Sequence, residues 1–169
     1  MRDLKEIDYT ILLELMKNSK ISDRQLARKI GVSQPTVTRR RSKLEKTVID
    51  DYTVIPNWVK LGYGIFAMTF VKINPKMRKR DEVEALRNRG ASWLESQSNV
   101  IMSGGCQGDG VDAFTLSFHK SYVEYDSFIR NLKLEMGDLI DEVRTVLVNL
   151  AGEEVLKPLS IKCLAEVEV

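Results

Sequence analysis

The sequence has very few of the side chains that bind metals or carry out nucleophilic catalysis. It contains one histidine, His119, and two cysteines, Cys106 and Cys163, which lie far apart and form no CxxC pair. A zinc site and a disulfide framework each need more of these residues or a closer spacing, and a single histidine weakens a proposal of a His-rich metal site or a Ser-His-Asp triad. We therefore expect two free thiols, no metal site, no cofactor and no enzymatic activity.

Long apolar segments are also missing. No run approaches the roughly 18–20 apolar residues that cross a bilayer. The first residues, MRDLKEID, are charged where a signal peptide has an apolar core. We expect a cytoplasmic protein that does not interact with a membrane.

Positive charge is concentrated in the first part of the chain. Residues 1–60 contain 13 lysines and arginines and 8 acids, a net charge of +5, whereas residues 61–169 contain 13 and 16, a net charge of −3. A basic segment on a slightly acidic remainder indicates a polyanionic partner for the first segment only.

Three helices are predicted in the first fifty residues. The stretch DLKEIDYTILLELMKN has apolar residues at helical spacing, which predicts an amphipathic helix. Ser22 begins a capping box, and Gly31 suits the left-handed position that ends a helix. A third helix starts after Ser33, with Pro35 in its first turn. Two short helices joined by a glycine-containing turn form a helix-turn-helix.

Three adjacent arginines, Arg39 to Arg41, lie on the third helix. Val37 and Leu44 mark its inner face, and successive residues advance by about 100°. Arg39 then points outward, whereas Arg41 points nearly inward and must pair with an acid or run along apolar surface. We predict that Arg39 contacts a base edge in the major groove, because its fork matches guanine O6 and N7.

The predicted DNA interface combines the start and outward face of the third helix with the end of the second. Arg40, which lies on a flank, and the lysines are expected to contact phosphates and so set the register on the duplex. The predicted residues are Arg28, Lys29, Ser33, Gln34, Pro35, Thr36, Thr38, Arg39, Arg40, Ser42, Lys43 and Lys46.

Residues 48–55 are predicted to form a β-hairpin that turns at Asp50-Asp51, which would make the first domain a winged helix-turn-helix. This DNA-binding domain is expected to span residues 1–56. Residues 57–63, between Pro56 and Gly64, are expected to form a linker.

The rest of the chain predicts the order βαββαβ of a ferredoxin-like domain over residues 64–150, so the fold class is α+β. Both helices of that fold cover one face of the sheet. The strand GIFAMTFVKI is apolar on both faces, so the open face should meet a second sheet, and we predict a homodimer. Residues 151–169 are expected to add an arm or a strand to that assembly.

The glycine-rich stretch GGCQGDG joins two of the predicted strands. It lacks the Gly-Lys-Ser/Thr ending of a phosphate loop and precedes a strand, so a nucleotide site is disfavoured. Two interpretations remain: a tight connection, or a loop that binds a small molecule at a dimer seam. The residues of the second interpretation are Gly104, Gly105, Gly108, Asp109, Gly110 and Asp112.

With these features in place, the chain resembles the leucine-responsive regulatory protein/AsnC (Lrp/AsnC, feast/famine) family of transcriptional regulators. The stretch EIDYTILLELMKNSKISDRQLARKIGVSQPTVTRRRSKLE resembles the family's helix-turn-helix, and GDGVDAFTLSF resembles its Gly-acid segment. The resemblance implies dimers that assemble further, commonly to octamers, and an amino-acid effector bound between C-terminal domains.

Two other functions fit parts of the sequence. Sirohaem decarboxylases resemble the same family, but they use histidine and arginine around the tetrapyrrole, and this chain offers only His119, expected at a surface or interface. These enzymes also have no need of a basic outward helix face. A sensing or assembly module without DNA affinity is the third possibility, which retained binding to promoter fragments at moderate salt would exclude. Sequence-specific DNA binding in transcription regulation is the prediction.

Overall fold

The computed structural model describes residues 4–76, 80–153 and 155–166, and all side chains in these ranges except those of residues 80–83 and 86. The chain forms two compact units. The first comprises Met1–Ile55 together with Pro158–Val169, and the second comprises Pro56–Lys157.

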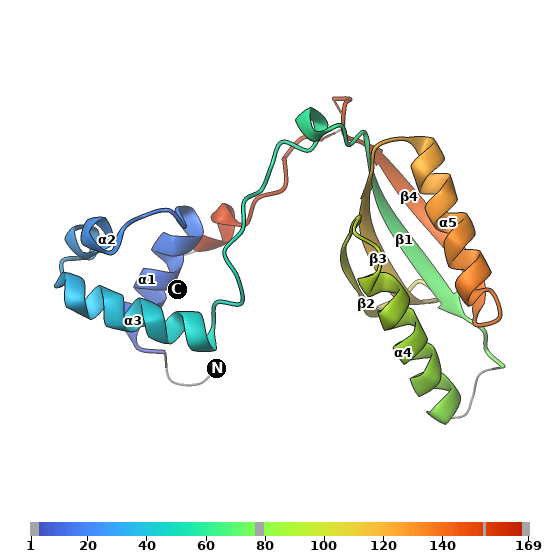
Figure 1. The fold of residues 1–169 in the computed structure, drawn as a ribbon, viewed down its shortest axis with the longest axis horizontal. Coiled ribbons are helices and arrows are strands. Elements are labelled where there is room, and N and C mark those ends of the chain that lie inside the picture. The colour runs from blue at the N-terminus through green and yellow to red at the C-terminus, as the bar shows by residue number, and fades with distance from the viewer. Residues whose placement is uncertain (1–3, 77–79, 154, 167–169) are drawn as a thin grey trace. The chain divides into compact units, whose positions relative to one another are not determined.

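The first unit is built on three helices (Figure 1): α1 (Glu6–Lys17), α2 (Asp23–Ile30) and α3 (Gln34–Thr47). α2 begins at the predicted capping box, where the Ser22 hydroxyl accepts a hydrogen bond from the backbone N–H of Gln25. It ends at Gly31, whose φ of 72° is the left-handed conformation that a C′ glycine tolerates. Pro35 lies in the first turn of α3, as predicted.

The predicted wing hairpin is wrong. None of residues 48–57 belongs to a strand. A two-residue hairpin turn of type I′ needs positive φ at both central residues, and neither Asp50 nor Asp51 has it. An isolated two-stranded hairpin is also marginal in water. The segment is held instead at Tyr52, whose hydroxyl donates to Glu45 of α3 at 3.1 Å.

The second unit has the predicted βαββαβ order. Its elements are β1 (Ile65–Ile73), α4 (Arg80–Glu95), β2 (Val100–Gly108), β3 (Val111–His119), α5 (Tyr122–Met136) and β4 (Ile140–Asn149). The strands form one antiparallel sheet in the order β2-β3-β1-β4. This is the ferredoxin-like topology, with β1 and β3 at the centre.

Both helices cover the same face of this sheet (Figure 1). Trp93 of α4 and Leu132 and Met136 of α5 pack with Val71 of β1 and Val143 of β4. The opposite face carries Phe66, Met68, Phe70, Phe114, Leu116 and Val146, which alternate with the covered residues along the strands.

The predicted linker is part of the second unit. The short 3-10 helix η1 (Val59–Leu61) follows Trp58, whose ring stacks on Phe118 with centroids 4.1 Å apart. Tyr63 meets the same phenyl ring edge-on at 5.9 Å. Aromatic packing therefore fixes residues 58–63 to the end of the sheet.

The described residues between 150 and 166 contain no strand, contrary to one form of the C-terminal prediction. They contain a 3-10 helix, η2 (Lys162–Ala165), which packs against α1 of the first unit.

Candidate nucleic-acid interface

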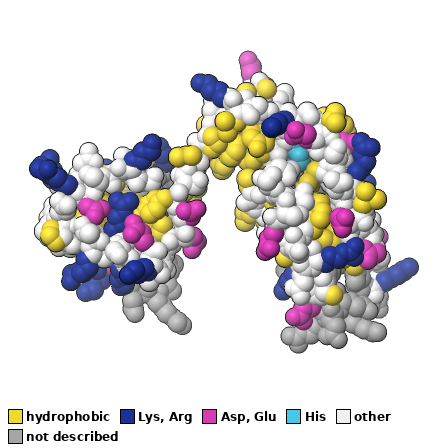
Figure 2. All heavy atoms as spheres, in the orientation of Figure 1, with side chains coloured by type: hydrophobic (Ala, Val, Ile, Leu, Met, Phe, Trp, Pro, Cys, Tyr) yellow, Lys and Arg dark blue, Asp and Glu magenta, His cyan; other side chains and the backbone are white. Residues whose placement is uncertain are grey.

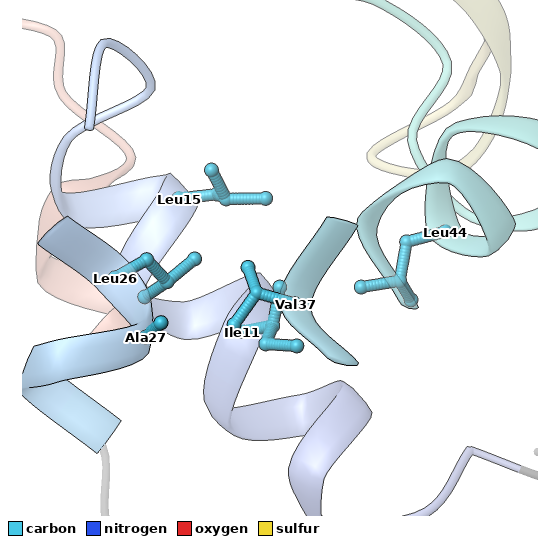
Figure 3. Packing of buried hydrophobic residues seen from close by; sticks show 6 residues of the cluster. All are labelled: Ile11, Leu15, Leu26, Ala27, Val37 and Leu44. Carbon is cyan, nitrogen blue, oxygen red and sulfur yellow. The ribbon is translucent and has the colours of Figure 1, made fainter. Parts of the chain in front are cut away.

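The position of α3 is set by the hydrophobic core of the first unit. Val37 and Leu44 of α3 are fully buried, and Figure 3 shows them with Ile11 and Leu15 of α1 and with Leu26 and Ala27 of α2. Since Val37 and Leu44 are seven residues apart, they lie on one side of the helix. The opposite side of α3 is therefore left at the surface.

The three adjacent arginines have three different surroundings. Arg39 is exposed and lines a shallow hollow of about 370 Å³ with Ser42, Lys43, Lys46 and Thr47. Within the described part of the chain, neither Arg39 nor the two lysines has a side-chain hydrogen bond or a salt bridge. The outward face of α3 thus carries three positive side chains without a salt bridge among the described residues.

Arg40 is engaged inside the unit. Its Nη1 lies 3.0 and 3.1 Å from the two carboxylate oxygens of Asp8, which is fully buried in α1. Burial alone would raise the pKa of the Asp8 carboxyl, but the backbone N–H of Lys5 and the Arg40 guanidinium lower it below its usual value. The predicted phosphate contact at Arg40 therefore competes with a structural ion pair, and only 18% of the Arg40 side chain is exposed.

Arg41 pairs with acids, as its inward direction predicts. Its guanidinium donates to Asp23 of α2 at 3.2 Å, to Glu45 at 3.1 Å and to the carbonyl oxygen of Ile21 at 3.1 Å. It also lies over the ring of Tyr52, 5.3 Å from the centroid. Arg41 thus ties α3 to α2 and to the segment that follows α3.

Some of the other predicted interface residues are exposed, and others form hydrogen bonds or a salt bridge within the unit. Gln34 and Pro35 are exposed at the start of α3, and Arg28 is exposed on α2. The hydroxyls of Ser33 and Thr36 lie 2.8 Å apart, and Thr38 donates to Asp23 at 2.7 Å. Lys29 forms a salt bridge with Glu14 of α1. Thr47, which lines the hollow but was not predicted, lies four residues beyond Lys43 on the same helix face.

The residues predicted to bind an effector lie mostly in paired strands. Gly104 and Gly105 belong to β2, opposite Phe114 and Ala113 of β3, so their backbone groups belong to the ladder. Asp109 and Gly110 form the turn, with φ values of 49° and 68°. Positive φ at both positions is the geometry of a tight type I′ hairpin. The structure therefore favours the tight connection for the turn itself.

A cavity of about 440 Å³ lies beside these strands, between α4, the end of α5 and the sheet. Gly104, Gly105 and Asp112 line it, whereas Gly108, Asp109 and Gly110 do not. Asp112 also accepts a hydrogen bond from the backbone N–H of Ile73 at 2.8 Å. The other lining residues are mostly apolar, with hydroxyls and charges in addition: Val71, Ile73, Arg87, Gly90, Ala91, Trp93, Leu94, Glu95, Ser103, Ala113, Thr115, Leu132, Met136 and Ile140.

The expectation that His119 lies at a surface is wrong. Only 2% of this residue is exposed, beneath Tyr125 and Phe128 of α5. Its ring nitrogens lie 2.9 Å from the Ser117 hydroxyl and 3.3 Å from the Asn99 amide. Burial lowers the pKa of the imidazole, although Glu124 opposes the shift. His119 is thus a neutral, hydrogen-bonded residue of the core.

The described residues hold no group of three or more histidine, cysteine or acidic side chains placed to bind a metal ion. None of the helices in the described ranges is long and apolar enough to span a membrane. Lysine and arginine side chains are distributed around the α1–α3 unit in Figure 2, with acidic side chains between them.

Residues 4–45 match the AsnC-type helix-turn-helix domain family. The whole chain is similar to the leucine-responsive regulatory protein of Rhizobium meliloti, with 30% identity over 146 residues that cover 86% of this chain and 88% of that protein. The chain belongs to the Lrp/AsnC family. The transcriptional regulator LrpA of Pyrococcus horikoshii is 32% identical over 64% of this chain and 79% of its own length.

Solved structures of Lrp/AsnC proteins have the same fold. The transcriptional regulator NMB0573 of Neisseria meningitidis, in complex with L-Met, superposes with a TM-score of 0.77 at 18% identity, over 94% of this chain and 96% of its own. AsnC of Escherichia coli gives a TM-score of 0.72 at 20% identity, over 94% and 99%. Like its relatives, this chain is a transcriptional regulator with a helix-turn-helix for DNA.

Proposed function

We propose that the outward face of α3 reads a specific DNA site in the major groove. The observation that carries the proposal is the hollow lined by Arg39, Lys43 and Lys46, whose side chains form no salt bridge with any described acid. Arg39 is the base-reading side chain, because its fork matches guanine O6 and N7. Lys43, Lys46 and Arg28 contact phosphates, and exposed Gln34 reaches the duplex from the start of the helix.

The chain acts as a homodimer through the open face of its sheet. Met102 and Val146 on that face are 56% and 52% exposed, and Met68, Phe70 and Leu116 lie between them. A contiguous apolar face of this kind supports burial against a second copy. Two copies of α3 then meet successive major grooves, so the DNA site is pseudo-palindromic. Assembly of such dimers to an octamer is the family's pattern.

The test of DNA recognition is a pair of arginine substitutions. A duplex selected from a random pool is titrated with the parent chain, with Arg39→Ala and with Arg130→Ala, and binding is followed by fluorescence anisotropy. Arg130→Ala is the matched control, since it removes one positive charge from the exposed surface of α5. Arg39→Ala should weaken specific binding by about 1–3 kcal/mol and leave binding to random duplex nearly unchanged. Equal affinities for Arg39→Ala and the parent on the selected duplex would reject the role.

A small-molecule effector is the second element of the function, and the cavity between α4 and the sheet supports it. Its volume lies in the range of small-ligand sites, and its lining is apolar apart from a few hydroxyls and charges. The structural neighbour in complex with L-Met makes hydrophobic amino acids the first candidates. Amino acids that raise the melting temperature of the parent should do so less in Ala113→Leu, which narrows the cavity. Equal shifts in both chains would place the effector elsewhere.

The chain is not an enzyme and acts in the cytoplasm. The sirohaem decarboxylase alternative would need an available histidine, and His119 is buried and hydrogen-bonded on both ring nitrogens. Addition of sirohaem should therefore leave the visible spectrum of the tetrapyrrole unshifted. A shift that saturates at one equivalent would revive the enzymatic alternative.

A further inference from the structure

Helix α1 is apolar on two sides. Asp8, Ile11 and Leu15 form the buried side that faces α2 and α3. Tyr9, Leu13 and Met16 form a second stripe at helical spacing, displaced by about a third of a turn. These three side chains lie outside the core cluster of the described residues, yet each is half-buried. A three-helix unit alone would leave such a stripe open to water.

The C-terminal part of the chain lies on α1. η2 packs against this helix, and Figure 1 shows the red segment beside α1. Ala165 is 3% exposed, whereas its neighbour Leu164 is 61% exposed, so one side of η2 is buried and the other faces water. The turn is closed by hydrogen bonds from Leu164 to Ile161 and from Glu166 to Cys163.

The two chain segments that connect the sheet unit to the first unit begin at residues that are hydrogen-bonded to each other. The backbone N–H of Leu150, just after β4, donates to the carbonyl oxygen of Gly64, just before β1, at 2.8 Å. Gly64 in turn donates to the carbonyl oxygen of His119 at 3.1 Å. The chain therefore passes between the units twice, once on each side of the Gly64–Leu150 bond.

We propose that residues 158–166 form a strap, which covers the second apolar stripe of α1 and makes the DNA-binding unit depend on the C-terminal part of the chain. The strap and α1 belong to the same chain, so the effective concentration of the strap near α1 is high. A contact that buries little surface is therefore enough to keep the strap bound to α1.

The test uses neighbouring substitutions in the strap. Ala165→Asp places a charge at the buried position, and Leu164→Asp places the same charge at the exposed one. Hydrogen–deuterium exchange of the full-length chains is followed by mass spectrometry. Ala165→Asp should speed exchange in α1 peptides by about tenfold or more, whereas Leu164→Asp leaves α1 unchanged and β1 peptides are unchanged in both chains. Equal α1 exchange in Ala165→Asp and the parent overturns the strap.

A chain that ends at Glu153 tests the strap independently, in case Ala165→Asp destabilises the whole protein. It keeps the Gly64–Leu150 hydrogen bond but lacks the strap. Faster exchange in α1 with parent-like exchange in β1 supports the proposal, and parent-like exchange in both overturns it. The exchange measurement needs no DNA, so it stands apart from the proposed DNA function. If the DNA function also holds, the shortened chain binds the selected duplex about tenfold more weakly or worse.

Discussion

Arg40 Nη1 lies 3.0 and 3.1 Å from the two carboxylate oxygens of Asp8, 32 residues earlier in the chain. The carboxylate is fully buried, and it also accepts a hydrogen bond from the Lys5 backbone N–H at 3.1 Å. This pair joins the first helix to the third. It also distinguishes two adjacent arginines, since Arg40 is paired within the fold whereas Arg39 is exposed.

Arg40→Met should therefore lower the free energy of unfolding and leave the DNA-sequence specificity unchanged. Removing the guanidinium leaves the buried Asp8 carboxylate without its charge partner, which costs about 3–5 kcal/mol in comparable sites. Arg39→Ala, at the exposed neighbouring position, should change the free energy of unfolding by less than about 0.5 kcal/mol. Urea denaturation followed by circular dichroism measures both. Equal losses in the two chains would contradict the assignment.

The same pair makes stability sensitive to acid. The pKa of Asp8 is below its model-peptide value of 3.8 in the folded protein, so folding favours the carboxylate. Its contribution is fully present above the unfolded pKa and is lost as the pH falls through the lower folded pKa. Asp8→Asn should be less stable than the parent at pH 7, and the difference should shrink below about pH 4. Melting curves of the two chains between pH 7 and about pH 4 test this prediction. A stability difference that does not change with pH would refute it.

Much of this architecture is predictable from local sequence signals. The capping box at Ser22, Gly31 at the end of α2 and Pro35 in α3 each fix a helix boundary through short-range geometry. Alternation in β1 and the order of the elements predict the ferredoxin-like sheet. The prediction of a wing was wrong because β-branched and aromatic residues form a strand only when a second strand pairs with them. Residues 48–57 contain no such pair.

The interface was less predictable because side-chain pairing depends on tertiary contacts. Helical geometry alone indicates that Arg39 points outward and Arg41 inward. It does not reveal that Arg40 meets Asp8, since the two lie on different helices. The buried position of His119 depends on the packing of α5, which a strand end in the sequence does not show. The packing of η2 on α1 is a long-range contact without a local signal.

The two lysines of the hollow should contribute to affinity without contributing to specificity. Lys43→Ala and Lys46→Ala should each weaken binding to selected and random duplexes alike. Each should also reduce the slope of log K against log salt concentration by about 1, because one fewer phosphate is neutralised. Lys133→Ala, on α5, is the matched control and should leave the slope unchanged. A loss confined to the selected duplex would make these lysines base-reading residues instead.

Dimerisation through the open face of the sheet should be lost when one apolar side chain becomes charged. Val146→Asp places a carboxylate on that face, in the edge strand β4 beside Met68, where burial against a second copy would desolvate it. Leu134→Asp, on the exposed side of α5, makes the same chemical change away from the face. Sedimentation velocity should show a smaller species for Val146→Asp only. An unchanged species in Val146→Asp would move the interface to another surface.

The most direct test of the account is chemical footprinting of lysines on the parent protein with and without the selected duplex. An amine-reactive acylating reagent modifies accessible lysines, and mass spectrometry reports the extent at each position. We predict that DNA protects Lys43 and Lys46 on the outward face of α3, while Lys72 and Lys133 of the sheet unit react as they do without DNA. Unchanged reactivity at Lys43 and Lys46, with protection in the sheet unit, would contradict it.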